Sequence, residues 1–247
     1  MPKNYNYNIS EPTETETFEI ETPSNIYVVS KTKSGKSFLL KHLLICIILA
    51  GKTDEIYIQG KTMDYVNDYD NLFPLMTERK KYINKNQFNI EQLKKVYKRQ
   101  RETKKEGKPM KNVIFLLDDI IGCYRSNSLE ANFISELTTH SRHLNITLII
   151  SVQHAKGILN PMIRENATNL LFSSITKDAE ATIASMCHVE KEAIAYITAR
   201  LNKYEFCYYT NDGDAKKASF LIVKVKSDDE VKGKAVEEIE VDKTDAK

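Results

Sequence analysis

Short apolar runs alternate with segments of helical periodicity along this chain. The runs are rich in β-branched residues, as is typical of buried strands, and occupy residues 25–30, 55–59, 113–117, 146–152 and 170–173. Helical spacing or a basic amphipathic pattern predicts helices over residues 36–50, 90–105, 128–140, 177–186 and 190–201. This alternation indicates an α/β fold, with a mostly parallel central sheet flanked by helices on both faces.

The remaining segments complete the domain organisation. Residues 1–24 are polar and rich in Thr and Glu, and we expect them to form an N-terminal arm. Residues 205–210 and 218–225 flank the turn sequence Asn-Asp-Gly-Asp, which predicts a C-terminal β-hairpin. Residues 60–89 carry no clear periodicity and are expected to be irregular. The sequence therefore predicts one folded domain over residues 25–225 and a charged, disordered tail over 226–247.

The loop between the first strand and the first helix carries phosphate-binding chemistry. It reads SKTKSGKS, which keeps the Gly-Lys-Ser end of the P-loop pattern but has Ser30 in place of its first glycine. Backbone N–H groups of such a loop and the helix N-terminus cradle phosphates. In this pattern Lys36 reaches the β- and γ-phosphates of ATP, and the Ser37 hydroxyl ligates Mg²⁺. We assign nucleotide contacts to Ser30, Lys31, Thr32, Lys33, Ser34, Gly35, Lys36 and Ser37, and expect strain at Ser30.

Two carboxylates follow the apolar run over residues 113–117. Asp118 and Asp119 come at the carboxyl end of that strand, where parallel sheets place their ligands. We predict that Asp118 holds Mg²⁺ and that Asp119 polarises the attacking water. A strand-ending Asp-Asp pair that simply begins a turn is the alternative. Gln153 ends the next strand and is predicted to sense the γ-phosphate if that strand lies between the other two; otherwise it only caps a strand end.

Basic residues outside the loop suggest further contacts. Arg142 and Arg164 are candidates for an arginine finger that completes the site of a neighbouring subunit, and we favour Arg142. The alternative for each is an ordinary salt bridge at a helix end. The basic stretch over residues 94–111 could follow the phosphates of a nucleic acid, although a solvated helix face explains it equally well.

Composition narrows the possible functions. The chain has 247 residues and a formal net charge of +2, which argues against coating nucleic acid by bulk charge. Cys46, Cys123, Cys187 and Cys207 are widely spaced and indicate neither a disulfide framework nor a zinc site. The start of the chain has no secretion signal, and the longest apolar run, residues 43–50, is too short to cross a membrane. We therefore expect an intracellular protein without a membrane partner.

Four segments in order carry a resemblance to a known family: SKTKSGKS, VIFLLDD, SRHLNITLIISVQ and PMIRENAT. Together they resemble the viral genome-packaging ATPases of the FtsK/HerA superfamily, which includes those of poxviruses, giant viruses and virophages. The resemblance covers about residues 25–175. It implies a P-loop NTPase of the ASCE, RecA-like type, with ATP and Mg²⁺ as cofactors.

The resemblance also implies a motor that pumps double-stranded DNA into a preformed capsid. Its partners would be double-stranded DNA, viral capsid proteins and other copies of itself in a pentameric or hexameric ring. It would act in the host cytoplasm or viral factory and associate with the virion. The resemblance carries over Lys36 and Ser37 for nucleotide and metal, Asp118 for the metal, Asp119 as catalytic acid, Gln153 as sensor and Arg142 as the finger in trans.

The chain departs from the family at several positions. Ser30 and Lys33 stand where the family's loop usually has glycine, and the second acid is Asp119 rather than the Glu of cellular members. Two other functions remain open at this stage. One is a cellular FtsK/HerA-type translocase or helicase, and the other is an ATP-dependent switch or assembly protein with little turnover.

Overall fold

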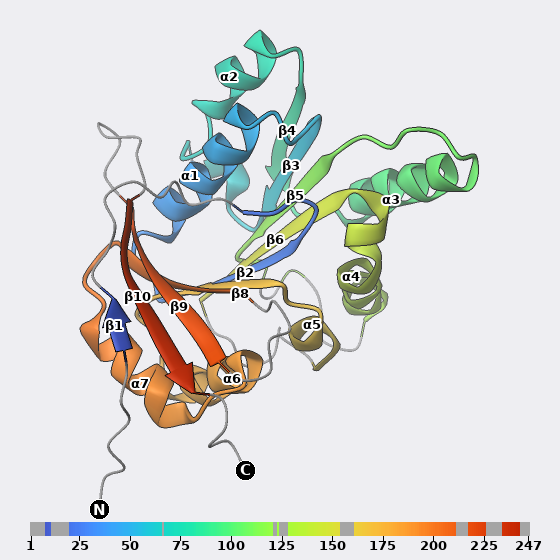
Figure 1. Ribbon diagram of the computed structural model, residues 1–247. Helices are drawn as coiled ribbons and strands as arrows, with labels where there is room; N and C mark the ends of the chain where they lie inside the picture. The colour runs from blue at the N-terminus through green and yellow to red at the C-terminus, as the bar shows by residue number, and fades with distance from the viewer. Residues whose placement is uncertain are drawn as a thin grey trace, which may run out of the picture.

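One mixed sheet of ten strands runs through the described part of the chain (Figure 1). The computed structural model describes residues 8–10, 20–65, 67–120, 123, 128–153, 161–210, 217–225 and 234–242. The strands are β1 (Asn8–Ser10), β2 (Asn25–Val29), β3 (Glu55–Gly60), β4 (Tyr82–Gln87), β5 (Val113–Asp118), β6 (Ile146–Val152), β7 (Asn169–Phe172), β8 (Glu205–Thr210), β9 (Lys217–Lys224) and β10 (Lys234–Asp242). Their order in the sheet is β1-β10-β9-β8-β7-β2-β6-β5-β3-β4.

The six strands from β7 to β4 are parallel, and the four from β8 onward are antiparallel. Strand β6 pairs with β2 on one side and with β5 on the other. This fulfils the condition on which Gln153 was assigned, because the strand that ends at Gln153 lies between the phosphate-loop strand and the Asp118 strand. The predicted fold class and the parallel core of the sheet are confirmed.

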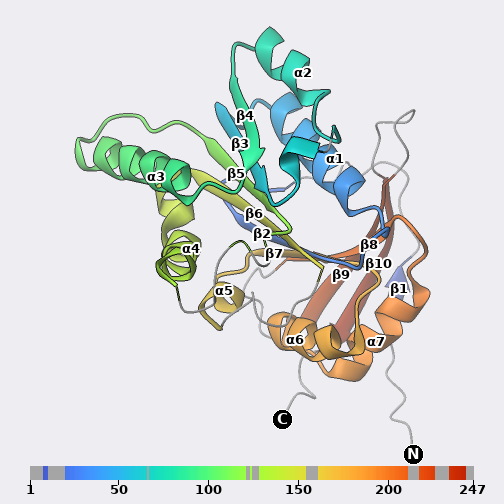
Figure 2. The ribbon, with the colours of Figure 1, turned by 180° about the vertical axis from the view of Figure 1, so that it is seen from behind.

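Helices cover both faces of the sheet (Figures 1 and 2). They are α1 (Lys36–Leu49), α2 (Leu72–Glu78), α3 (Ile90–Lys105), α4 (Leu129–His140), α5 (Pro161–Glu165), α6 (Lys177–Cys187) and α7 (Lys191–Arg200), with short 3₁₀ turns η1 (Met63–Tyr65) and η2 (Ser141–Leu144). Buried side chains of α1 and α2 form one apolar cluster with the sheet, and those of α3 to α7 form the other.

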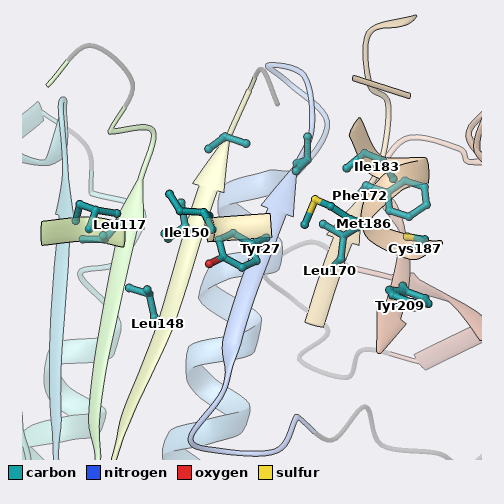
Figure 3. Close-up of a cluster of buried hydrophobic side chains, with 14 of the residues drawn as sticks. Tyr27, Leu117, Leu148, Ile150, Leu170, Phe172, Ile183, Met186, Cys187 and Tyr209 are labelled. Atoms are coloured by element: carbon teal, nitrogen blue, oxygen red, sulfur yellow. The ribbon is translucent and has the colours of Figure 1, made fainter. Parts of the chain in front are cut away.

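Strand periodicity assigns the side chains to these two clusters. In β5, Ile114 and Leu116 face α1, whereas Phe115 and Leu117 face the opposite cluster, as expected from alternating strand side chains. Because helices cover both faces of the sheet, the β5 side chains on both faces are apolar. This explains the continuous apolar run VIFLL in the sequence. Figure 3 shows the second cluster, in which Tyr27 and Ile150 project from neighbouring strands.

Two segments differ from the expected organisation. Residues 60–89 contain α2 and β4 rather than only irregular chain. The β4 sequence YINKNQ is mostly polar because it forms the edge of the sheet and is at most half-buried. The expected disordered tail contains β10, which pairs antiparallel with β9. The alternation of Ile239, Glu240 and Val241 is a strand signal that the high charge of the tail obscured.

The predicted C-terminal hairpin is present as β8 and β9, which pair antiparallel and extend the main sheet. Its predicted turn over residues 211–214 lies outside the described residues. The N-terminal arm contributes β1, which pairs with β10 at the far edge of the sheet.

The buried carboxylate of Glu55 links the basic helix α3 to the sheet. Glu55, only 3% exposed at the start of β3, accepts hydrogen bonds from Arg99 (2.5 Å), Lys111 (2.7 Å) and the Tyr57 hydroxyl (3.0 Å). Burial raises the pKa of Glu55, but these partners outweigh it and hold the pKa below its ordinary value. Several cations of the basic stretch thus act within the subunit, which favours the structural interpretation of those residues over contact with nucleic acid.

We predict that Glu55→Gln lowers the free energy of unfolding by about 2 kcal/mol at pH 7, because a charged acceptor is lost. Since the pKa of Glu55 is lowered by folding, its stabilisation is present above pH 4.5, its ordinary pKa, and is lost as the pH falls through the lowered value. Urea unfolding at several pH values measures this. Glu102→Gln is the control, since its exposed pair with Lys98 should contribute less than about 0.5 kcal/mol. If the wild type remained more stable than Glu55→Gln at pH values well below the lowered pKa of Glu55, the result would contradict a stabilising role for the Glu55 charge.

Candidate nucleotide-binding site

The phosphate loop follows β2 and is held by both neighbouring strands. Ser30 N–H donates to the Val152 carbonyl at the end of β6 (3.1 Å), and Lys31 N–H donates to the Ser174 carbonyl beyond β7 (2.8 Å). Gly35 then begins α1 as its N-cap in the left-handed region, with φ of 97°. No side chain caps α1, and its first turn carries no acidic residue. The free N–H groups of this turn therefore fit an anion.

The strain expected at Ser30 is not found. Ser30 is fully buried, has no positive φ, and its hydroxyl accepts a hydrogen bond from the Ser34 hydroxyl (2.9 Å). The left-handed positions in the loop are instead Gly35 and Lys33, with φ of 65° at Lys33. The loop thus accommodates a serine at its start, and the cost of about 1–3 kcal/mol for a left-handed non-glycine residue falls on Lys33.

Lys36 is the buried cation of the site. Its side chain is 11% exposed, and its ammonium group makes no hydrogen bond to any residue that the structure describes. The nearest anionic oxygen is Asp118 Oδ1, at 3.7 Å. A buried ammonium with unused donors is costly by itself, so this geometry fits a phosphate ligand that would accept those hydrogen bonds.

The Asp118 carboxylate is oriented from two directions. Oδ1 accepts a hydrogen bond from the Ser151 hydroxyl of β6, and Oδ2 accepts one from the Tyr69 hydroxyl (3.1 Å). Burial and the adjacent Asp118 charge raise the pKa of Tyr69 well above its ordinary value, so Tyr69 remains a donor. Tyr69 follows η1 in the segment expected to be irregular, and nothing in its local sequence points to it. Ser151, in contrast, is a polar interruption of the apolar run over residues 146–152.

Gln153 connects the second acid to the phosphate loop. Its Nε2 donates to Asp119 Oδ2 (2.6 Å), and its Oε1 accepts a hydrogen bond from the Thr32 hydroxyl (2.8 Å). Asp119 has a left-handed backbone with φ of 50°, so the chain turns directly after Asp118. The two neighbouring carboxylates consequently reach different partners. The predicted residues Thr32, Lys36, Asp118, Asp119 and Gln153 thus lie together at one edge of the sheet.

These residues line a cavity of about 880 Å³, which is large enough for a nucleoside triphosphate. Among the described residues, five lysines line it: Lys31, Lys33, Lys36, Lys41 and Lys203. The acidic residues in the same part of the lining are Asp68, Asp118 and Asp119. The excess of cations suits a polyanionic ligand that brings a divalent cation with it.

Tyr204 lines the cavity on the side of α1, and no motif or periodicity in its sequence predicts this. It precedes β8, its N–H donates to the Ser34 carbonyl (3.3 Å), and its ring meets Phe38 edge-to-face with centroids 5.9 Å apart. A Cβ atom placed on Gly35 would lie 2.3 Å from Tyr204 Cδ1. Gly35 is therefore required both by its backbone angle and by the aromatic ring packed against it.

Arg142 and Arg164 lie away from this cavity. Arg142 is exposed in η2, just before β6, and Arg164 is half-buried in α5, just before β7. Both precede their strands, whereas the cavity lies at the strand ends. The seven residues of β6 rise about 3.3 Å each, so the strand between η2 and Gln153 is about 23 Å long. Neither arginine therefore belongs to the site of its own subunit.

The donor set fits Mg²⁺ bound together with a nucleotide. Among the described residues, no group of three or more His, Cys, Asp and Glu side chains could hold a metal ion alone. Mg²⁺ commonly uses one or two protein oxygens together with substrate phosphates and water. Ser37 and Asp118, which both line the cavity, would supply these protein ligands.

The sequence pattern of the family described as "Poxvirus A32 protein" matches residues 17–237, nearly the whole chain. This chain belongs to the poxvirus A32 protein family. The match confirms the resemblance to viral genome-packaging ATPases and extends it through β8 and β9 into the start of β10. No curated protein sequence matches the chain significantly.

Several solved structures share the fold. The genome-packaging NTPase B204 of Sulfolobus turreted icosahedral virus 2, in complex with ATPγS, is 18% identical, with a TM-score of 0.59, over 84% of this chain and 100% of that one. B204 of Sulfolobus turreted icosahedral virus is 19% identical, with a TM-score of 0.58, over 82% and 98%. The conjugation coupling protein TcpA of pCW3, with ATPγS, is 17% identical, with a TM-score of 0.53, over 85% and 64%.

Family, fold and motifs together identify this poxvirus A32 family member as a P-loop ATPase that binds ATP. Within the described residues, no helix is both long and apolar enough to span a bilayer. All four cysteines carry free thiols, and Cys187 and Cys207 are buried.

We predict that Gly35→Ala weakens ATP affinity at least ~10-fold, because strain above about 1.4 kcal/mol would be imposed on the phosphate loop. Isothermal titration with a non-hydrolysable ATP analogue measures the affinity. Gly51→Ala is the matched control: Gly51 also has positive φ (71°), but its Cβ would meet open space away from the cavity. Gly51→Ala should cost stability and leave the affinity unchanged. Equal losses of affinity in both variants would show that the Tyr204 contact is irrelevant.

Proposed function

We propose that this A32 family member is an ATP-driven motor that moves double-stranded DNA into a preformed viral capsid. The observation that carries the proposal is that one cavity is lined by Lys36, Asp118, Asp119 and Gln153. Together these side chains provide the groups that ATP hydrolysis requires. The family supplies the viral setting. The B204 proteins, which share the fold along most of both chains, are named as genome-packaging and DNA-packaging enzymes.

The geometry of the cavity supports the following roles in hydrolysis. Lys36 donates its unused hydrogen bonds to the β- and γ-phosphates of ATP. Ser37 and Asp118 would hold Mg²⁺, which would supply positive charge next to the phosphates. Asp119 accepts a proton from the attacking water, and Gln153 fixes the Asp119 carboxylate against the phosphate loop through Thr32. Gln153 would thus relate the state of the γ-phosphate to the position of the catalytic acid.

An arginine that stabilises the transferring phosphoryl group comes from a second copy of the chain. Among the described residues that line the cavity, the cations are lysines, and Arg142 lies at the opposite sheet edge, before β6, which is about 23 Å long. Head-to-tail contact would bring that edge of one subunit to the nucleotide of the next, and repetition of such a contact closes a ring. We assign Arg142 as the finger, in a pentamer or hexamer that also contacts DNA and capsid proteins in the host cytoplasm or viral factory.

We predict that Asp119→Asn lowers Mg²⁺-dependent ATP turnover by about 10²–10⁴-fold while ATP still binds, since a general base is removed. Phosphate release is measured with and without double-stranded DNA. The wild type should be stimulated by DNA, and the variant should not. Asp118→Asn is the comparison, because it should impair Mg²⁺-dependent binding as well. Tight binding with negligible wild-type turnover, with or without DNA at high protein concentration, would contradict the motor and favour an ATP-dependent switch.

We predict that Arg142→Ala lowers turnover by about 10³-fold or more without weakening ATP binding, because its effect falls on the neighbour's transition state. Arg164→Ala is the matched comparison at the same sheet edge and should retain most activity. Turnover should also rise more steeply than protein concentration in the wild type, since the site is completed by association. If Arg164→Ala lost activity and Arg142→Ala did not, the arginine finger would instead be Arg164 in α5.

A further inference from the structure

At the amino edge of the sheet, the Asn25 side chain forms hydrogen bonds through both its amide nitrogen and its amide oxygen. Asn25 is the first residue of β2 and is fully buried. Its Nδ2 donates to the Thr138 carbonyl (2.7 Å) and to the Asn166 carbonyl (2.9 Å). Its Oδ1 accepts a hydrogen bond from the Ser141 hydroxyl (2.6 Å). Such a set of bonds requires an amide, because an aspartate would place negative charge against two carbonyl oxygens.

The partners of Asn25 belong to the elements that carry the two arginines. Ser141 directly precedes Arg142 in η2. Asn166 follows α5, two residues after Arg164. The Thr138 carbonyl lies in the last turn of α4, where helix carbonyls lack partners within the helix. One buried side chain therefore ties the end of α4, the start of η2 and the end of α5 to a single strand.

The backbone of the same strand adds to this attachment. Asn25 N–H donates to the Thr168 hydroxyl (2.9 Å), and Thr168 N–H donates to the Asn25 carbonyl (3.1 Å). Five residues further along, β2 becomes the phosphate loop at Ser30. A single strand thus connects the nucleotide cavity of a subunit to the arginine-bearing edge of the same subunit.

We propose that Asn25 is a positioning residue for the surface that each subunit presents to the ATP of a second copy of this chain. The inference rests on the proposed function, since it presumes that Arg142 acts in trans. Asn25 sets the position of Arg142 through Ser141 and fixes it relative to β2. Removing the amide leaves the cavity of its own subunit intact and displaces the arginine offered to the neighbour.

Mixing inactive variants separates these two effects. Lys36→Ala disables a subunit's own site but keeps its arginine edge, whereas Asn25→Ala is expected to do the reverse. Each variant alone should show less than about a tenth of wild-type turnover, with ATP affinity of Asn25→Ala unchanged. An equimolar mixture should recover activity, since about a quarter of the interfaces pair an intact cavity with an intact arginine edge. A protein that merely misfolds would recover nothing.

Two further variants test whether Asn25 acts through Ser141. Ser141→Ala removes only the hydroxyl that binds Asn25 Oδ1, and it should lower kcat with KM unchanged. Ser24→Ala is the matched control: Ser24 is the adjacent buried polar residue, and its hydroxyl has no hydrogen-bond partner among the described residues, so turnover should stay at the wild-type level.

The reference mixture combines Lys36→Ala with Arg142→Ala. Recovery in both mixtures supports the proposal. Recovery with Arg142→Ala but not with Asn25→Ala overturns the role of Asn25 and leaves the trans arginine standing. Recovery in neither mixture overturns the trans arginine and, with it, the inference.

Discussion

The parallel pairing of β6 with both β2 and β5 is the constraint on which the site depends. Its register sets Ser151 opposite Asp118 and Val152 opposite Val29, so three strands end at the same level. The Ser151 hydroxyl then reaches Asp118, and Gln153 reaches both Asp119 and Thr32. A shift by one residue would turn these side chains to the other face of the sheet. Catalytic geometry is therefore a direct consequence of strand register.

The two edges of the parallel sheet carry different sets of functional residues. The carboxyl edge holds the phosphate loop, the acids and Gln153, with the N-terminus of α1 and lysines suited to anions. The amino edge holds the exposed Arg142 and the buried Asn25 that anchors its neighbours. In the proposed function, these two edges carry complementary parts of one active site, and head-to-tail association of subunits would bring them together.

Backbone strain gathers around the cavity. Six non-glycine residues in the described part of the chain have positive φ, and Lys33, Asp119 and Tyr204 among them line the cavity. Each costs about 1–3 kcal/mol and persists only where the surrounding structure enforces it. Neighbouring strands and hydrogen bonds enforce it here, since Tyr204 N–H is held by Ser34 and Asp119 N–H by Ser151. The fold thus supports a strained but preorganised site.

The sequence alone determined the α/β class and the helix and strand pattern of the core. It also predicted Lys36, Asp118, Asp119 and Gln153 as candidate site residues. These are local signals, because periodicity and short motifs need no distant partner to be recognised. It missed β4 and β10, whose polar or charged sequences form strands only through pairing with the sheet. The contacts of Tyr69, Tyr204 and Asn25 join residues 49 to 170 positions apart, and Tyr69 also lies in a segment without periodicity. Only the tertiary structure could decide these contacts, since strand order and register bring their partners together.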